Sequence, residues 1–91
     1  MEARAHLLIS GLVQGVLFRK RIMELARSKG INGWVRNLRD GSVEAVCEGD
    51  KSNIDALIQF CHVGPPGAKV RSVDTQWSEF KSEFRGFKIR H

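Results

Sequence analysis

Apolar and polar residues alternate along several short stretches of the chain, which is the pattern of β-strands with one buried face. A hairpin joins two of these stretches, because the dipeptide Asp40-Gly41 between them is typical of tight turns. Gly11 is predicted to end the first strand, and a β-bulge is predicted at Arg71-Ser72 in the fourth. The predicted strands cover residues 4–10, 33–38, 42–48, 70–77 and 87–89.

Two stretches between the strands repeat apolar residues every three or four positions, which predicts two amphipathic helices. The first helix is predicted to end at Gly30, and the second ahead of Pro65, since proline cannot continue a helix. Ser52 and Asp55 form a weak variant of the capping box that begins a helix. The apolar residues are Phe18, Ile22, Leu25 and Ala26 in the first helix, and Ile54, Leu57, Ile58 and Cys61 in the second.

The order of these elements is βαββαβ followed by one more strand. This order is typical of an α+β fold, the ferredoxin-like sandwich, in which an antiparallel sheet carries two helices on one face and the first and third strands are central neighbours. Glu44, Val46 and Glu48 share one side of the third strand, so we expect the sheet to be covered on its other side only. Trp34 and Phe18 are expected to be core aromatics. Residues 1–91 are predicted to form one domain, because no linker or repeat divides them.

The net charge of +5 favours anionic partners, either small phosphorylated molecules or nucleic acid, and charge alone does not distinguish the two. No apolar run is long enough for a membrane span and no signal peptide is visible, so we expect a cytoplasmic protein with no membrane partner. Cys47 and Cys61 lack the CxxC spacing and are expected to be reduced thiols. The 3 histidines are scattered along the chain, so we expect neither a metal site nor a cofactor.

The stretch from Gly11 to Arg19 concentrates the candidate chemistry of the chain. Two glycines bracket a short turn before the first helix, where the first backbone N–H groups have no partner within the helix. Such a turn can bind an anion, and Arg19 adds a charged planar fork suited to two phosphate oxygens. Spacing alone favours the other interpretation, an ordinary strand-to-helix turn followed by a solvated surface cation, because short motifs often match by chance.

Two long motifs occur in this chain. The first is G-x-V-Q-G-V-x-F-R over residues 11–19, and the second is G-W-V-R-N-x-x-x-G-x-V over residues 33–43. Together with the segment G-P-P-G-A at residues 64–68, they resemble the signatures of the acylphosphatase family. The resemblance runs from about Arg4 to Arg90 and covers nearly the whole chain.

The resemblance implies hydrolysis of acyl phosphates, with Arg19 binding the phosphate and Asn37 positioning the attacking water. Inorganic phosphate, the product, is then expected to compete with the substrate. The motif offers no nucleophile and no strong general base, which suits an acyl phosphate because its carboxylate leaving group has a pKa of about 4–5. Leu38 departs from many animal members of the family, which have a hydroxyl residue there. The implied phosphate-binding loop consists of Gln14, Gly15, Val16, Leu17, Phe18 and Arg19.

Two other functions fit parts of the sequence. A basic βαββαβ domain is also the architecture of the RNA-recognition motif, but the third strand has no aromatic residue and places Glu44 and Glu48 where RNA would bind. A non-catalytic domain that binds acyl or carbamoyl phosphate, as in the hydrogenase maturation protein, would carry the same motifs inside a much larger chain. We expect a free-standing, monomeric hydrolase without a nucleic-acid partner.

Overall fold

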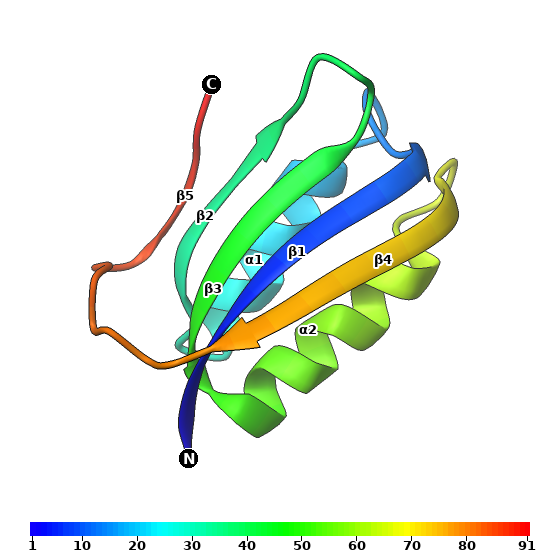
Figure 1. Ribbon diagram of the computed structural model, residues 1–91. Coiled ribbons are helices and arrows are strands. Elements are labelled where there is room, and N and C mark those ends of the chain that lie inside the picture. The colour runs from blue at the N-terminus through cyan, green and yellow to red at the C-terminus, as the bar shows by residue number, and fades with distance from the viewer.

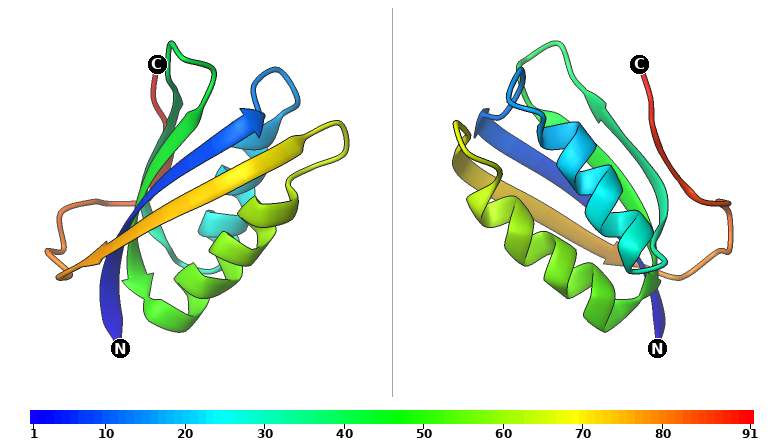
Figure 2. Two further views of the ribbon diagram at one scale, coloured as in Figure 1. Left: turned by 45° about the vertical axis from the view of Figure 1, so that its right-hand side comes forward. Right: turned by 180° about the vertical axis from the view of Figure 1, so that it is seen from behind.

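The computed structural model describes the whole chain, residues 1–91. The strands form one sheet in the order β4-β1-β3-β2-β5, and both helices pack against the same face of it (Figure 1, Figure 2). The predicted ferredoxin-like α+β sandwich is confirmed. Neither helix has the length and apolar character needed to cross a bilayer. The elements are β1 Glu2–Leu12, α1 Phe18–Ser28, β2 Asn32–Asn37, β3 Val43–Asp50, α2 Lys51–Val63, β4 Lys69–Ser78 and β5 Phe87–Ile89.

The central pair of the sheet is β1 with β3, as predicted, and their antiparallel register sets Leu7 opposite Ala45. β2 and β4 flank this pair and are also antiparallel to their neighbours. β5 instead pairs with the outer edge of β2 in parallel, with Lys88 opposite Trp34. The path of the chain explains this, because β4 finishes at the end of the sheet where β2 begins, and residues 79–86 cross this end to the outer side of β2 (Figure 1). The sheet is therefore antiparallel in its four main strands and parallel at one edge.

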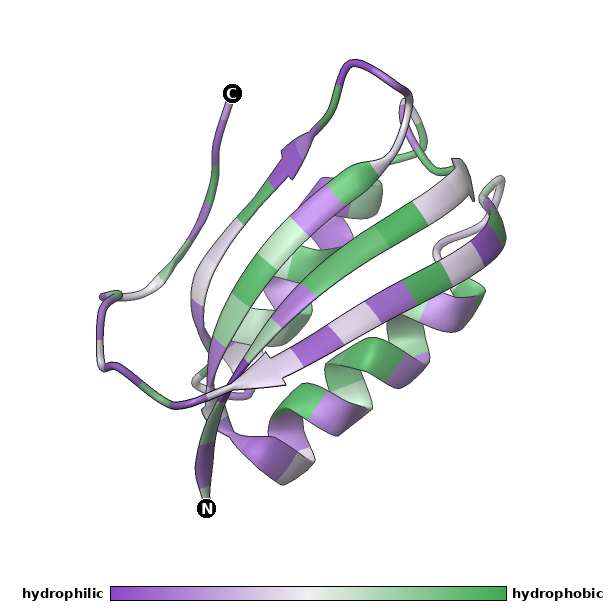
Figure 3. Ribbon diagram, viewed as in Figure 1, coloured by the Kyte–Doolittle hydropathy of each residue, from purple (hydrophilic) through white to green (hydrophobic).

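The core lies between the sheet and the helices, and the residues that the alternating pattern placed inward fill it. Ala5, Leu7 and Ile9 of β1 are fully buried, and Figure 3 shows hydrophobic and hydrophilic residues alternating along the strands. Burying a Leu or Ile side chain contributes about 1.5–3 kcal/mol of transfer free energy. Cys47 and Cys61 belong to this core as free thiols. Burial raises the pKa of Cys61 to about 12, so this thiol stays protonated and unreactive at neutral pH.

Two local predictions differ from the structure. β1 continues one residue beyond Gly11, whose φ of 125° brings the backbone so close to the Lys69 carbonyl that a Cβ would clash with it. The β-bulge predicted at Arg71-Ser72 is confirmed, because the register of β1 with β4 shifts opposite this point and leaves Arg71 without a partner. The capping-box prediction is wrong, because the N-cap of α2 is Asp50, whose carboxylate accepts a hydrogen bond from the Ser52 N–H at 2.9 Å. Asp50 ends β3 and directly precedes the helix, so it serves both elements.

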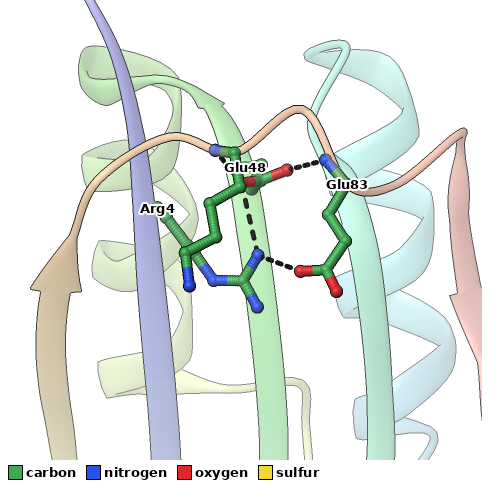
Figure 4. Close-up of polar contacts among 4 residues, drawn as sticks. Arg4, Glu48 and Glu83 are labelled. Carbon is green, nitrogen blue, oxygen red and sulfur yellow. Dashed lines mark hydrogen bonds and ion pairs between the residues drawn. The ribbon is translucent and has the colours of Figure 1, made fainter.

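Residues 79–86, called the strap below, cover part of the sheet face opposite the helices, which the sequence predicted to be uncovered. The strap is anchored on Glu48, which is 1% exposed (Figure 4). The Glu48 carboxylate accepts hydrogen bonds from the backbone N–H groups of Lys81 at 2.6 Å and Glu83 at 2.9 Å, and from the Arg4 guanidinium at 3.3 Å. Burial alone would raise the pKa of Glu48, but these donors hold it below its ordinary value of 4.5.

Replacing Glu48 with Gln should release the strap and destabilise the fold. The amide keeps the shape of the carboxylate but brings N–H groups towards groups that are already donors, so the free energy of unfolding should fall by about 2–3 kcal/mol. Because the folded-state pKa is lowered, the stabilisation is fully present above the ordinary pKa of 4.5 and is lost as pH falls through the folded-state value. Urea denaturation between pH 7 and pH 3 should therefore show the gap between variant and parent narrowing in acid.

Glu79→Gln provides the matched control, because Glu79 is an exposed carboxylate of the same strap. It should change the free energy of unfolding by less than about 0.5 kcal/mol. A Glu48→Gln variant as stable as the Glu79→Gln variant at pH 7 would contradict the anchoring role.

Candidate active site

Three segments that are distant in the sequence meet at one end of the sheet: the loop between β1 and α1, the end of β2, and β5 (Figure 1). They enclose a cavity of about 220 Å³. Arg19 at the start of α1 and Asn37 at the end of β2 both line this cavity. The structure thus brings together the two side chains that the sequence singled out. The lining residues are Val13, Gly15, Leu17, Phe18, Arg19, Lys20, Asn37 and Ile89.

The backbone N–H groups of residues 14–20 donate no hydrogen bond to any other group of the chain. Two left-handed residues shape this loop, Gly15 with φ 75° and Leu17 with φ 63°. Left-handed residues within a turn direct successive N–H groups into a common concavity, which suits an anion. Leu17 is also the N-cap of α1 and provides no side-chain acceptor for the helix start. A non-glycine residue in this conformation costs on the order of 1–2 kcal/mol, so the loop stores strain where it leaves its amides open.

The side chains that line the cavity include cations but no anions. Arg19 is half-buried and Lys20 is exposed, and neither forms an ion pair. The next residue, Arg21, differs, since it lies 3.7 Å from the carboxylate of Glu24 on the same helix. The positive end of the α1 dipole adds to the field of the two free cations. The charged side chains that an anion would meet in this cavity are therefore all cations.

Asn37 contributes an acceptor on the other side of the cavity. Its side-chain carbonyl oxygen is buried and has no hydrogen-bond partner, and no other buried side-chain nitrogen or oxygen of the chain is in this state. Leaving such an atom unpaired costs about 1–3 kcal/mol, so native proteins rarely do it without a function. The Asn37 backbone is fixed by its pairing with Val43 at the end of the β2–β3 ladder. The ladder therefore fixes the backbone of Asn37 at the edge of the cavity that this residue lines.

Gln14 lies in the predicted phosphate-binding loop, but its side chain faces away from the cavity. The Nε2 group donates one hydrogen bond to the carbonyl of Leu38 at 2.8 Å and another to the carbonyl of Ser42 at 2.9 Å. Only the backbone of Gln14 is then free to contact an anion. The sequence indicated the backbone group and gave no signal for the side-chain contacts.

Val13, Lys20 and Ile89 also line the cavity, although they were not among the predicted site residues. Ile89 comes from β5, where it lies two residues after the buried Phe87 and thus on the same, helix-facing side. That spacing was visible in the sequence. The parallel pairing of β5 with β2, which brings Ile89 next to the cavity, was not.

The aromatic residues of the two motifs lie on opposite faces of the sheet. Phe18 is 1% exposed and packs edge to face on Phe60, with ring centroids 6.0 Å apart, so its predicted place in the core is confirmed. The prediction for Trp34 is wrong. Its ring lies on the face without helices, with the guanidinium carbons of Arg36 and Arg90 at 5.2 Å and 4.8 Å from its centre. Its buried neighbours in β2 alternate with it and take the core positions.

The family model for acylphosphatase matches residues 5–89 of the chain. The chain belongs to the acylphosphatase family. The acylphosphatase of Pelotomaculum thermopropionicum is 47% identical to it over 88 residues, which cover 97% of this chain and 96% of that relative. The crystal structure of acylphosphatase from Bacillus subtilis matches the fold with a TM-score of 0.94 at 28% identity, and the match covers 100% of both chains.

A part of full-length HypF also matches this acylphosphatase family member, with a TM-score of 0.85 and 26% identity. That match covers all of this chain but only 12% of HypF, whereas the matched acylphosphatases have the length of this chain. The chain is a hydrolase of the acylphosphatase family that corresponds to its small members.

Proposed function

We propose that the cavity hydrolyses acyl phosphates to a carboxylate and inorganic phosphate, by in-line attack of water on phosphorus. One observation carries the proposal: Arg19, Asn37 and residues of the loop line the same cavity, and the loop N–H groups and the Asn37 side-chain oxygen have no hydrogen-bond partner within the chain. The three groups have separate tasks. The loop and Arg19 bind the phosphoryl group, and Asn37 orients the water.

In this proposal the phosphoryl group lies against the loop, where the N–H groups of residues 14–18 and the Arg19 guanidinium donate hydrogen bonds to its oxygens. Phosphoryl transfer passes through a loose transition state whose charge is spread over three equatorial oxygens. Fixed donors directed at these oxygens are therefore the main contribution that a catalyst can make. Arginine suits the task because its planar guanidinium can donate two parallel hydrogen bonds to one oxyanion.

Asn37 holds the water in this proposal. Its amide group has a carbonyl acceptor and two N–H donors, so it can accept a hydrogen bond from water and donate one to a phosphoryl oxygen. The buried, unpaired carbonyl oxygen is available for the first of these contacts. The pairing with Val43 limits the movement of the residue, which favours a fixed direction of attack.

The chemistry of the lining residues favours acyl phosphates over phosphate monoesters. No carboxylate, imidazole, thiol or hydroxyl group lines the cavity. A monoester releases a poor alkoxide leaving group and calls for acid catalysis or a metal, whereas an acyl phosphate releases a carboxylate with a pKa of about 4–5. A site that supplies only donors and a positioned water is sufficient for the second reaction.

Nucleic-acid binding is less well supported by the structure. An RNA-recognition motif uses the sheet face without helices, and bases stack there on aromatic residues of the strands. In this chain the strap covers Glu48 on that face. The two carboxylate oxygens of Glu44 lie 2.7 Å from His6 Nε2 and 2.7 Å from Arg36 Nε. The strap therefore occupies part of the face on which RNA would lie, and the two carboxylates are already paired with groups of the chain.

The proposal also includes a monomeric, cytoplasmic enzyme that needs no metal or cofactor and has no membrane partner. All side chains assigned to the reaction come from one chain, so no second copy is needed to complete the site. The two buried, unpaired thiols fit a reducing compartment.

The direct test of the proposed function is hydrolysis of acetyl phosphate by the purified protein with a chelator present. We expect full activity, because every group assigned to the reaction belongs to the chain. Loss of activity on chelation that returns with a divalent metal would contradict the donor-only site, and no hydrolysis under any condition would contradict the function itself.

Inorganic phosphate should raise the thermal unfolding midpoint, because it binds the folded loop and not the unfolded chain. At a concentration of 100 Kd the expected stabilisation is about 2.7 kcal/mol. Arg19→Ala should abolish this shift, while Arg21→Ala, which removes the same charge two residues further along α1 and outside the cavity lining, should keep it. An equal shift in the Arg19→Ala variant would place the anion elsewhere.

Asn37→Asp separates water positioning from general-base catalysis. The carboxylate loses the N–H donors and faces an anionic substrate, and two unit charges about 4 Å apart repel by roughly 4 kcal/mol at an effective dielectric constant of 20. We expect kcat to fall on the order of 10²-fold or more in both Asn37→Asp and Asn37→Ala, by analogy with the loss of one oxyanion donor. Phosphate binding should survive in the Ala variant.

Steady-state kinetics from pH 4 to pH 9, with circular dichroism to verify folding, measure this effect. Asn53→Asp makes the same substitution on α2, far from the cavity, and should retain parental kcat. An Asn37→Asp variant as active as the parent would overturn the water-positioning role.

A further inference from the structure

The loop that lines the cavity and the turn that follows Asn37, residues 38–42, are not joined by the sheet. The ladder between β1 and β3 ends with Ile9 opposite Val43, and beyond this point β1 pairs with β4 alone. No backbone hydrogen bond connects residues 13–17 with the turn at residues 38–42. The loop supplies the unpaired N–H groups, and the turn follows directly after Asn37. A separate contact must therefore set the distance between the two halves of the site.

The Gln14 side chain makes this contact. Its Nε2 group donates to the carbonyls of Leu38 and Ser42, at the two ends of the turn, at 2.8 Å and 2.9 Å. Each carbonyl also accepts a backbone N–H from within the turn, from Gly41 at 3.2 Å and from Leu38 at 2.9 Å. Both N–H hydrogens of the Gln14 amide are thus used, and the amide joins the loop to an already ordered turn.

We infer that Gln14 is a positioning residue for the hydrolysis, an inference that rests on the proposed function. Leu38 directly follows Asn37, so holding its carbonyl fixes Asn37 relative to the loop N–H groups. The Gln14 side chain does not line the cavity and acts through these groups. In-line attack needs the water and the phosphoryl group in register, and a displacement of about 1 Å can cost about 10²-fold in rate. No other side chain hydrogen-bonds the loop to the turn.

Gln14→Glu makes the link depend on pH. An ionised carboxylate has no donor and faces two carbonyl oxygens, whereas the protonated acid can donate one hydrogen bond. The surrounding carbonyls and partial burial favour the neutral form and raise the pKa of such a group. We therefore expect kcat of this variant, relative to the parent, to rise by about 10-fold or more from pH 8 to pH 5.

Gln14→Met removes both hydrogen bonds at similar side-chain size. It should lower kcat by about 10-fold or more at every pH, with KM and the dissociation constant of inorganic phosphate within about threefold of the parent. Gln59→Glu is the matched control, because Gln59 is exposed on α2, and its kcat relative to the parent should not vary with pH.

Kinetics with acetyl phosphate from pH 5 to pH 8, with far-ultraviolet circular dichroism at each pH, decide the matter. A parental kcat in Gln14→Met, or a Gln14→Glu ratio that does not change with pH, would overturn the inference. Loss of folded structure in Gln14→Met would also overturn it, because Gln14 would then be needed for folding. Failure of the proposed function looks different: the parent itself would be inactive, or Asn37→Ala would retain full activity.

Discussion

The pairing of β1 with β3 is the constraint on which the rest of the structure depends. β3 also pairs with β2, so the far ends of β1 and β2 come to the same end of the sheet. The loop after β1 and Asn37 at the end of β2 meet there for that reason. The same strands carry Leu7 and Ala45 into the core, so one ladder both buries the apolar face and assembles the cavity.

The cavity differs from the rest of the molecule because polar groups of its lining residues lack hydrogen-bond partners. Elsewhere a buried polar group is paired, as the Glu48 carboxylate is with the strap and Arg4. At the cavity the loop amides and the Asn37 oxygen stay unpaired, and Leu17 holds a strained conformation. The fold tolerates these costs because the core and the strap stabilise it elsewhere. Unpaired donors in the loop and an unpaired acceptor on Asn37, in residues that line one cavity, are the groups on which the proposed binding of an anion and a water rests.

Local patterns in the sequence predicted the strands, the helices and the two motifs, because alternation and helical spacing depend on neighbouring residues. They did not predict contacts between distant segments. Glu48 looked like an ordinary surface carboxylate until residues 79–86 were seen to cover it, and the Gln14 side chain gave no sign of its bonds to the turn. Trp34 was assigned to the core because its type is apolar, although its place between the buried residues of β2 puts it on the opposite face. The short parallel strand β5 likewise depends on the path of the strap.

Two mechanisms of acyl phosphate hydrolysis break different bonds of the substrate. A site that binds the phosphoryl group leads to cleavage of the P–O bond, whereas an acyl-transfer site leads to cleavage of the C–O bond. In the first, water attacks phosphorus and the carboxylate leaves with its original oxygens. In the second, the attack is on the carbonyl carbon. Hydrolysis of acetyl phosphate in water enriched in the heavy oxygen isotope, followed by mass spectrometry of both products, distinguishes the two. We predict that the isotope appears in inorganic phosphate and not in acetate, and its appearance in acetate would contradict the assignment of Arg19, the loop and Asn37 to attack on phosphorus.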